Sequence, residues 1–193
     1  MTRCLTCALL ILFVVPNLGQ AQSTYGLEFS AGLLGKVERD PEGAGADKHD
    51  LATSWAIAPW MEFPIGKAAG IGPEMNFVWV KRDDAKDSED RRLIVSPHVR
   101  LRMTFPIVKR VTFDGFISLG PSWWTRTDKA DDDPVEENRL GWGLRFGFGG
   151  SYAINKAVAI FMHVGYQSST SYGDTMEYSV DSIPVALGLR AAY

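Results

Sequence analysis

The sequence has little cysteine, no excess of positive charge and no long apolar run beyond its first residues. Its two cysteines, Cys4 and Cys7, precede an apolar run at the N-terminus, and no cysteine follows them. The rest of the chain therefore cannot form a disulfide, a thiolate metal site or a cysteine nucleophile. The formal net charge of −3 at pH 7 argues against a nucleic-acid-binding protein. Without an apolar run of about 20 residues, membrane-spanning helices are excluded as well.

The N-terminus has the pattern of a secretory signal peptide. Arg3 precedes the apolar run 8–15, and Pro16 and the small residues Gly19 and Ala21 follow it. This order of a positive residue, a short apolar run and small residues predicts a signal peptide over residues 1–21 that is cleaved after Ala21. We expect residues 22–193 to form one domain.

The last stretch of the chain, 183–193, alternates strictly. Every second residue from Ile183 to Tyr193 is apolar, whereas the residues between them are small apart from Pro184 and the charged Arg190. A period of two is typical of a β-strand with two different faces. The same alternation recurs in seven earlier segments, at 25–33, 55–63, 71–79, 93–105, 111–123, 140–148 and 158–166.

Eight such segments predict an all-β fold, an eight-stranded antiparallel up-and-down transmembrane β-barrel. Their lengths suit the roughly 9–11 residues of a tilted membrane-spanning strand, and the number of strands is even, as in single-chain bacterial barrels. The large apolar residues would face lipid and the small and charged residues the interior. A soluble ligand-carrying barrel requires the reverse arrangement, an apolar interior and a polar exterior.

Three similar pentapeptides mark the expected short turns, at 63–67 (FPIGK), 105–109 (FPIVK) and 152–156 (YAINK). Short turns then lie at one end of the barrel and long loops at the other, as periplasmic turns and extracellular loops do. The outward aromatic residues sort into two groups near these two ends, with tryptophans at the long-loop end. Four prolines interrupt the strands, and counting back from the turns pairs Pro59 with Pro73 and Pro97 with Pro121.

The inward positions carry a balanced set of charges. The predicted interior network comprises Glu28, Glu62, Glu74, His98, Arg100, Arg102, Asp114, Arg145, His163 and Arg190. An eight-stranded barrel is just wide enough for side chains to fill it, so we expect these residues to form a mutually satisfied plug of ion pairs. A narrow ion path, or a site for a small polar ligand, is the alternative interpretation.

No catalytic, cofactor-binding or metal-binding residues are predicted. His163 lies near Ser168 and Ser169 in sequence, but no acid is placed beside them, and His163 points inward by parity. The acidic segment 127–138 lacks the spaced ligands and glycine of a calcium loop, so a solvated loop is expected. Its carboxylates leave open the binding of bridging cations or external ligands.

Taken together, the leader, the eight alternating strands, the short turns and the terminal aromatic residue resemble the small eight-stranded outer-membrane barrels of the OmpA/OmpX-like group. The resemblance implies an integral protein of the Gram-negative outer membrane, in contact with its lipids and lipopolysaccharide. It also implies delivery by periplasmic chaperones to the barrel assembly machinery, with Tyr193 ending the assembly signal. The expected function is a non-enzymatic structural or surface-interaction role. The alternatives are a narrow channel or transporter and, less favoured, a lipid A-modifying enzyme.

Overall fold

The structure is a computed structural model that describes residues 23–41, 47–82, 91–128, 135–172 and 176–192. The predicted signal peptide and Tyr193 lie outside the described residues. The chain forms eight strands: β1 (Thr24–Pro41), β2 (Asp47–Pro64), β3 (Ala69–Arg82), β4 (Arg91–Val108), β5 (Val111–Asp128), β6 (Val135–Ala153), β7 (Val158–Tyr172) and β8 (Met176–Ala192). Among the described residues, no helix is long and apolar enough to cross a membrane.

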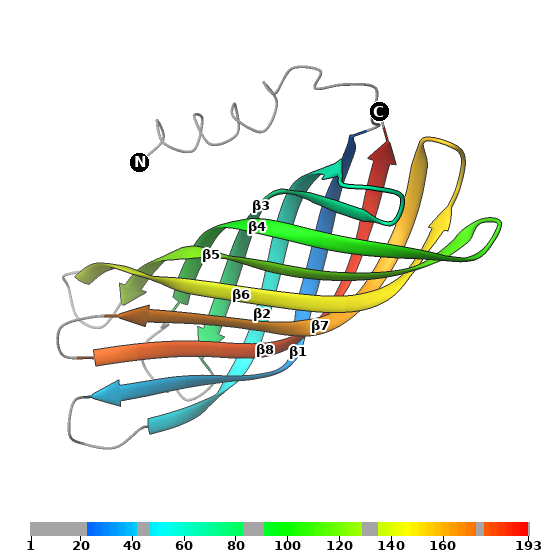
Figure 1. The fold of residues 1–193 in the computed structure, drawn as a ribbon. Helices are drawn as coiled ribbons and strands as arrows, with labels where there is room; N and C mark the ends of the chain where they lie inside the picture. Colours follow the sequence, from blue (N-terminus) through cyan, green and yellow to red (C-terminus); the bar gives the residue numbers. More distant parts are fainter. Residues whose placement is uncertain (1–22, 42–46, 83–90, 129–134, 173–175, 193) are drawn as a thin grey trace.

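The strands follow one another around a closed antiparallel barrel (Figure 1). Each strand pairs with its neighbours in sequence, and β8 returns to pair with β1 from Thr24–Ala192 to Pro41–Met176. No edge strand is left open, so every strand finds hydrogen-bonding partners on both sides. The predicted fold class is confirmed.

The two faces of each strand separate as predicted. Large apolar side chains such as Phe29, Phe146 and Leu187 lie exposed on the outside, whereas the alternate residues are buried inside. Met61 is an exception, because it was expected on the outer face but is buried. Met61 lies opposite Pro73 of β3, at a point where the ladder between β2 and β3 has a gap.

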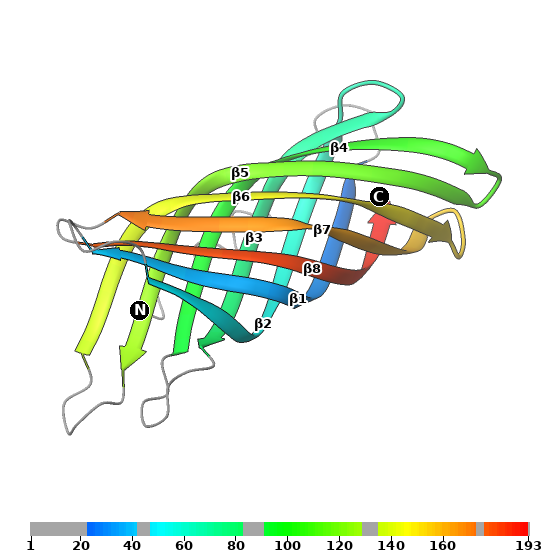
Figure 2. The same cartoon turned by 90° about the horizontal axis from the view of Figure 1, so that it is seen from below.

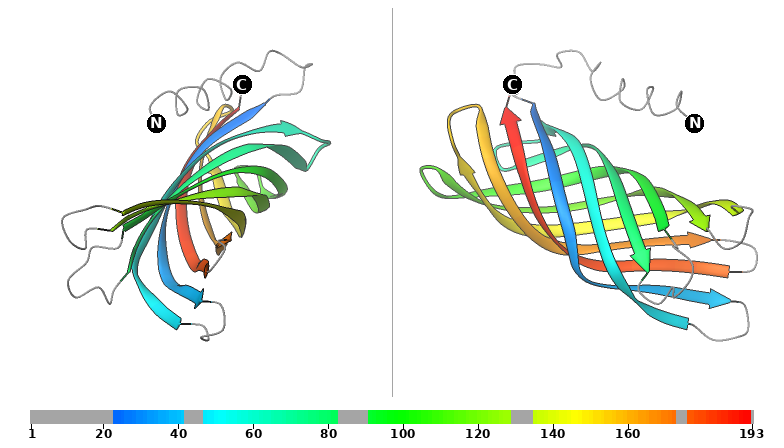
Figure 3. Two further views of the ribbon diagram at one scale, coloured as in Figure 1. Left: turned by 90° about the vertical axis from the view of Figure 1, so that its left-hand side faces the viewer. Right: turned by 180° about the vertical axis from the view of Figure 1, so that it is seen from behind.

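The strands are longer than the alternating apolar segments from which they were predicted. β1 and β2 continue through the register pairs Lys36–Asp50 and Arg39–Asp47, which the sequence had assigned to a loop. Charged residues give no apolar period there, but the backbone ladder does not need one. The long strands twist and curve around the common interior (Figures 2 and 3).

The three similar pentapeptides do not make three similar turns. In the first hairpin Gly66 adopts a φ of 116°, and the turn occupies 65–68. Val108 stands at the equivalent position of the second hairpin, and a β-branched residue is strained at positive φ. There the strand continues through Val108 to the tighter turn 109–110. In the third hairpin the side chain of Asn155 stabilises the turn, because its Oδ1 accepts hydrogen bonds from the backbone N–H groups of Ala157 and Val158 at 2.8 Å.

The proline pairing is half right. The flanking pairs Val95–Trp123 and Val99–Leu119 place Pro97 opposite Pro121, as predicted. The pairing of Pro59 with Pro73 is wrong, because the pairs Phe63–Ile71 and Pro64–Gly70 centre the first turn one residue later than predicted. The pairs Trp60–Glu74 and Phe63–Ile71 set Pro59 opposite Met75 and Pro73 opposite Met61 across this ladder.

The positive φ of Gly66 generates a stability prediction. Gly66→Ala is expected to destabilise the refolded barrel by about 1–2 kcal/mol, because an alanine is strained at that φ. Urea unfolding in lipid vesicles, followed by tryptophan fluorescence, measures the loss. Gly115→Ala is the matched control, since the added methyl meets nothing closer than 3.8 Å. An equal loss in both variants contradicts the argument.

Candidate functional site

The barrel interior is the candidate functional site. The structure places all ten residues of the predicted network there, and each of the eight strands contributes at least one: Glu28 from β1, Glu62 from β2, Glu74 from β3, His98, Arg100 and Arg102 from β4, Asp114 from β5, Arg145 from β6, His163 from β7 and Arg190 from β8. Because alternate residues of neighbouring strands point to the same side, residues distant in sequence meet in one lumen.

The centre of the network is a cross of two arginines and three glutamates. Glu74 accepts hydrogen bonds from Arg100 Nη1 and from Arg145 Nη1, both at 2.6 Å. Arg145 also donates to Glu28, and Arg100 donates to Glu62 through Nε at 3.1 Å. Both arginines and all three glutamates are nearly inaccessible to solvent. Such burial of charge is tolerated only where each ion has opposite charges in contact.

A second layer lies nearer the short turns. Arg102 Nε donates to Glu62 at 2.6 Å, and Arg102 Nη1 donates to Asp114 at 3.2 Å. Arg190 reaches the same aspartate from the opposite wall, at 3.4 Å from Nη1 to Oδ1. Thr104 adds a hydroxyl hydrogen bond to Asp114 at 2.7 Å. Glu62 therefore joins the two layers into one network, since it contacts both Arg100 and Arg102.

The two histidines lie at the periphery of this network. His98 Nδ1 is 3.6 Å from Glu74 and 3.3 Å from Ser118 Oγ, while His163 Nδ1 is 3.8 Å from Glu28. The network is not mutually satisfied throughout, contrary to the prediction. Among the described residues, His98 Nε2, Arg100 Nη2 and both ring nitrogens of His163 have no hydrogen-bond partner.

Aromatic rings complete the site, and sequence reasoning gave them no role. The guanidinium carbon of Arg100 lies 3.8 Å from the ring centre of Phe116 and 4.9 Å from that of Trp60. Phe116 also contacts the ring of His163, as does Phe161. Cation–π contacts of this kind gain strength when the cation is removed from water. The sequence does indicate their position, because all three aromatic residues stand at the alternate positions that face the interior.

Each of these aromatic residues lies directly across the ladder from a glycine. The register pairs are Gly26–Trp60, Phe116–Gly147 and Phe161–Gly188. A Cβ on Gly26 or Gly188 would lie 2.1 Å from the facing ring. Because these glycines have no side chain, the three large rings can lie against the wall of a narrow barrel.

An apolar cluster lies in the interior on the long-loop side of the ion pairs. It comprises Ala56, Val78, Val80, Ile94, Trp124, Tyr178 and Val180, all buried. Arg92 and Arg139 lie over the ring of Tyr178, with their guanidinium carbons 4.4 and 4.8 Å from its centre. A charged plug and an apolar cluster thus occupy successive levels of the same interior.

No group of three metal-ligating side chains occurs among the described residues. His163 and Ser169 are both buried inside the barrel, at 4% and 2% exposure. The central part of the acidic loop, residues 129–134, lies outside the described residues.

The central cross predicts a large cost for removing one ion. Arg145→Met is expected to destabilise the barrel by about 3–5 kcal/mol, because Glu28 and Glu74 lose a buried partner. Chemical unfolding in vesicles measures the change. Adding Glu28→Gln to Arg145→Met is expected to restore part of the loss, since it removes one unpaired charge.

Arg110→Gln is the control for that experiment, because Arg110 is exposed and makes a single long hydrogen bond to Tyr152 at 3.4 Å. It is expected to leave stability nearly unchanged. A similar loss for the Arg145 and Arg110 variants contradicts the role of the plug.

Comparisons with known proteins identify the fold. No protein-family model matches the chain, and no curated protein matches it. Similar solved structures include Neisserial surface protein A (15% identity, 88% of this chain and 97% of that chain, TM-score 0.51). They also include outer membrane protein OprG from Pseudomonas aeruginosa (14%, 90% and 96%, TM-score 0.51) and outer membrane protease OmpT from Escherichia coli (6%, 88% and 97%, TM-score 0.53). The chain has the fold of the small outer-membrane β-barrels.

Proposed function

We propose that this chain is an integral outer-membrane barrel with a closed interior and a structural or surface-interaction role. The observation that carries the proposal is the polarity of the barrel, which is apolar outside and ionic inside. Exposed leucine, phenylalanine and isoleucine side chains cover the outer wall. In water such a surface is unfavourable, whereas in lipid it is the required one.

The dimensions of the outer face support a membrane location. Phe63 and Trp55 mark the two ends of the apolar band on β2, and both lie on the outer face. Eight residues of tilted strand rise roughly 20–25 Å, which is close to the apolar band of about 25 Å in outer-membrane barrels. At the tryptophan level Trp55 stacks on Trp79 at 4.0 Å, and the hydroxyl of Tyr166 donates to Asp181 at 2.7 Å. Rings with polar partners suit headgroup depth.

The strand extensions support a role at the cell surface. Beyond the tryptophans, β1 and β2 run on through residues with charged side chains, and their ladder continues. This arrangement presents a paired backbone above the apolar band. Recognition of external ligands through the acidic loops remains part of the proposal.

The proposal places the chain in the outer membrane after export with a cleaved signal peptide. Lipids and lipopolysaccharide surround the barrel, and periplasmic chaperones deliver it to the barrel assembly machinery. Tyr193 ends the assembly signal.

A narrow channel is the second candidate. Polar atoms without partners, among them Asn76 Nδ2 and Ser96 Oγ, line the described interior on the long-loop side of the ion pairs. Buried polar atoms of this kind favour internal water. The ion-pair layer and the apolar cluster nevertheless lie in series along the lumen, which favours a closed interior.

We propose no enzymatic activity. The fold hosts a protease in OmpT, so the fold alone does not decide the question. In this chain the histidines of the network are buried in the lumen, away from lipid and from protein substrates. Unchanged lipid A mass spectra in cells with and without the protein are the expected result.

The membrane proposal predicts a depth-dependent cost for a charge on the outer face. Ile117, which is 48% exposed near the middle of the band, is the test position. Ile117→Arg is expected to destabilise the barrel in vesicles by about 2–4 kcal/mol. Ile65→Arg is the control, because Ile65 lies in a turn outside the band and is 55% exposed. Equal effects at the two positions contradict a transmembrane orientation.

The closed interior predicts electrical silence. Planar bilayers that contain the wild-type protein are expected to show no discrete currents, since side chains fill the lumen. The triple variant Arg145→Ala/Phe116→Ala/Trp124→Ala removes volume from the central layer and from the apolar cluster in series with it, and it is expected to open measurable conductance. Currents through the wild-type barrel favour the channel candidate instead.

A further inference from the structure

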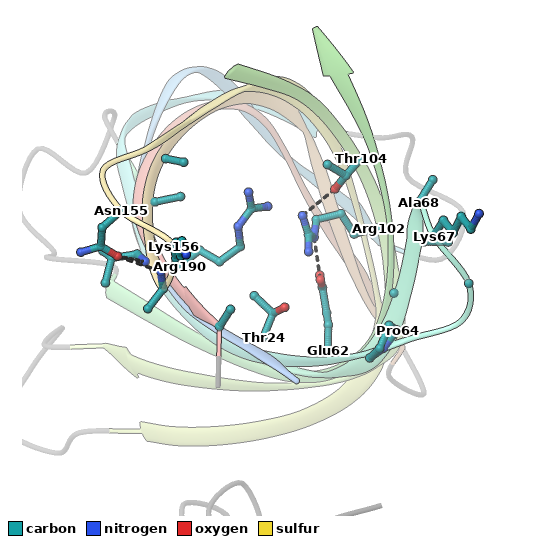
Figure 4. Close-up of a pocket in the computed structure, with 18 residues that line it drawn as sticks. Thr24, Glu62, Pro64, Lys67, Ala68, Arg102, Thr104, Asn155, Lys156 and Arg190 are labelled. Atoms are coloured by element: carbon teal, nitrogen blue, oxygen red, sulfur yellow. Dashed lines mark hydrogen bonds and ion pairs between the residues drawn. The ribbon is translucent and has the colours of Figure 1, made fainter. Parts of the chain in front are cut away.

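The interior opens at the short-turn end into a cavity of about 310 Å³ (Figure 4). Its walls include Glu62, Arg102, Thr104, Lys156 and Arg190. The two arginines extend into the lumen from opposite walls (Figure 4), and Asp114, which is not drawn there, contacts both guanidinium groups through Oδ1. This cavity lies on the short-turn side of the central cross, and members of the second layer of the network form part of its walls.

The two arginines of the cavity differ from the two at the centre. The side chains of Arg100 and Arg145 are 0% and 2% exposed, whereas those of Arg102 and Arg190 are 11% and 15% exposed. Arg190 also makes the weakest ion pair of the four arginines, since its closest carboxylate oxygen is 3.4 Å away. Its position toward the open lumen is therefore not explained by Asp114 alone.

Hydrogen-bond donors remain available on both walls. Arg102 uses Nε for Glu62 and Nη1 for Thr104 and Asp114, which leaves Nη2 without a partner among the described residues. Arg190 uses Nη1 for Asp114 and Nη2 for Ser151, at 2.9 Å, which leaves Nε. A guanidinium group cannot lose its proton at physiological pH, so these donors stay charged.

The charge at the mouth is positive. Glu62 is the one acid among the described lining residues, and it is shared by Arg100 and Arg102. Four acids and four arginines balance within the network, so Lys156 at the rim adds a charge that no described carboxylate contacts. Lys67 also borders the cavity, but Figure 4 shows its side chain directed away from the lumen.

We propose that this cavity binds the phosphate group of a phosphate monoester or diester. Donors from two opposite walls and from the rim require an acceptor whose oxygens point in several directions. A tetrahedral phosphate offers that arrangement, whereas a planar carboxylate offers two oxygens in one plane. The volume accommodates a small ester such as glycerol 3-phosphate. The same group is presented by a soluble ester and by the headgroup of a phospholipid at the barrel rim.

The binding site itself does not depend on the proposed function, but its exposure to the periplasm does, through the assignment of the short turns to that side. Silence in planar bilayers tests the closed interior, and phosphate binding tests the cavity. A negative result in one experiment therefore does not contradict the proposal that the other experiment tests.

Calorimetric titration of the refolded barrel with glycerol 3-phosphate, in an amine oxide detergent without phosphate, is the test. Saturable binding is expected, with acetate weaker by about tenfold or more. Arg190→Gln is expected to weaken glycerol 3-phosphate binding by about tenfold, and Lys156→Gln by a smaller factor. Absence of saturable binding, or equal binding of acetate, overturns the proposal.

Lys109→Gln is the matched control, because Lys109 occupies the equivalent place in another short turn and is not among the residues that line the cavity. It is expected to leave the affinity unchanged, and an effect as large as that of Lys156→Gln overturns the site. Heat-dependent mobility on gels verifies folding of each variant. Should Arg190→Gln fail to fold, Arg190→Lys keeps the charge and removes the planar fork, and it is also expected to weaken binding.

The source of the phosphate is distinguished by repeating the titration in nanodiscs of phosphatidylglycerol. Loss of glycerol 3-phosphate binding there identifies the lipid headgroup as the occupant, and retained binding identifies a soluble ester. Both results support the phosphate site, and a wild-type barrel that binds in neither setting overturns it.

Discussion

The structure depends on one electrostatic constraint, which is that charge removed from water must be matched inside the barrel. Glu28, Glu62 and Glu74 are almost fully inaccessible, and each contacts at least one arginine. An isolated buried carboxylate would cost several kcal/mol, so the strands that carry these residues have to align in one register. The ion pairs therefore specify how the strands match as well as filling the lumen.

Register and side-chain volume reinforce each other in this interior. The pairing that brings Arg145 to Glu74 is the same pairing that sets Phe116 opposite Gly147. A shift of one residue would turn the ions toward lipid and place the ring against a side chain. Polar and apolar contacts thus favour the same arrangement, which is the consistency expected of a sequence that encodes a single structure.

The alternation of the sequence was sufficient to predict the barrel, because period two is a local property. It also placed all ten residues of the network inside, since parity alone decides the face. It could not supply distances between strands far apart in sequence, and so the division of Arg100 and Arg102 between two layers came only from the structure. The strand extensions were missed because their charged residues lack an apolar period. The different turn at Val108 was missed because the pentapeptides are similar except at this position, where the first turn has Gly66 at positive φ.

The pairing of β1 with β8 has a consequence for how the barrel forms. Thr24 and Ala192 are register partners at opposite ends of the described residues, so the seam joins segments that are far apart in sequence. Loop closure over such a separation is entropically costly and slow. Every other strand pair joins neighbours in sequence and can form locally, whereas β1 and β8 each keep an unsatisfied edge until the seam closes. A barrel that has not closed is therefore exposed to pairing with another chain along those two edges.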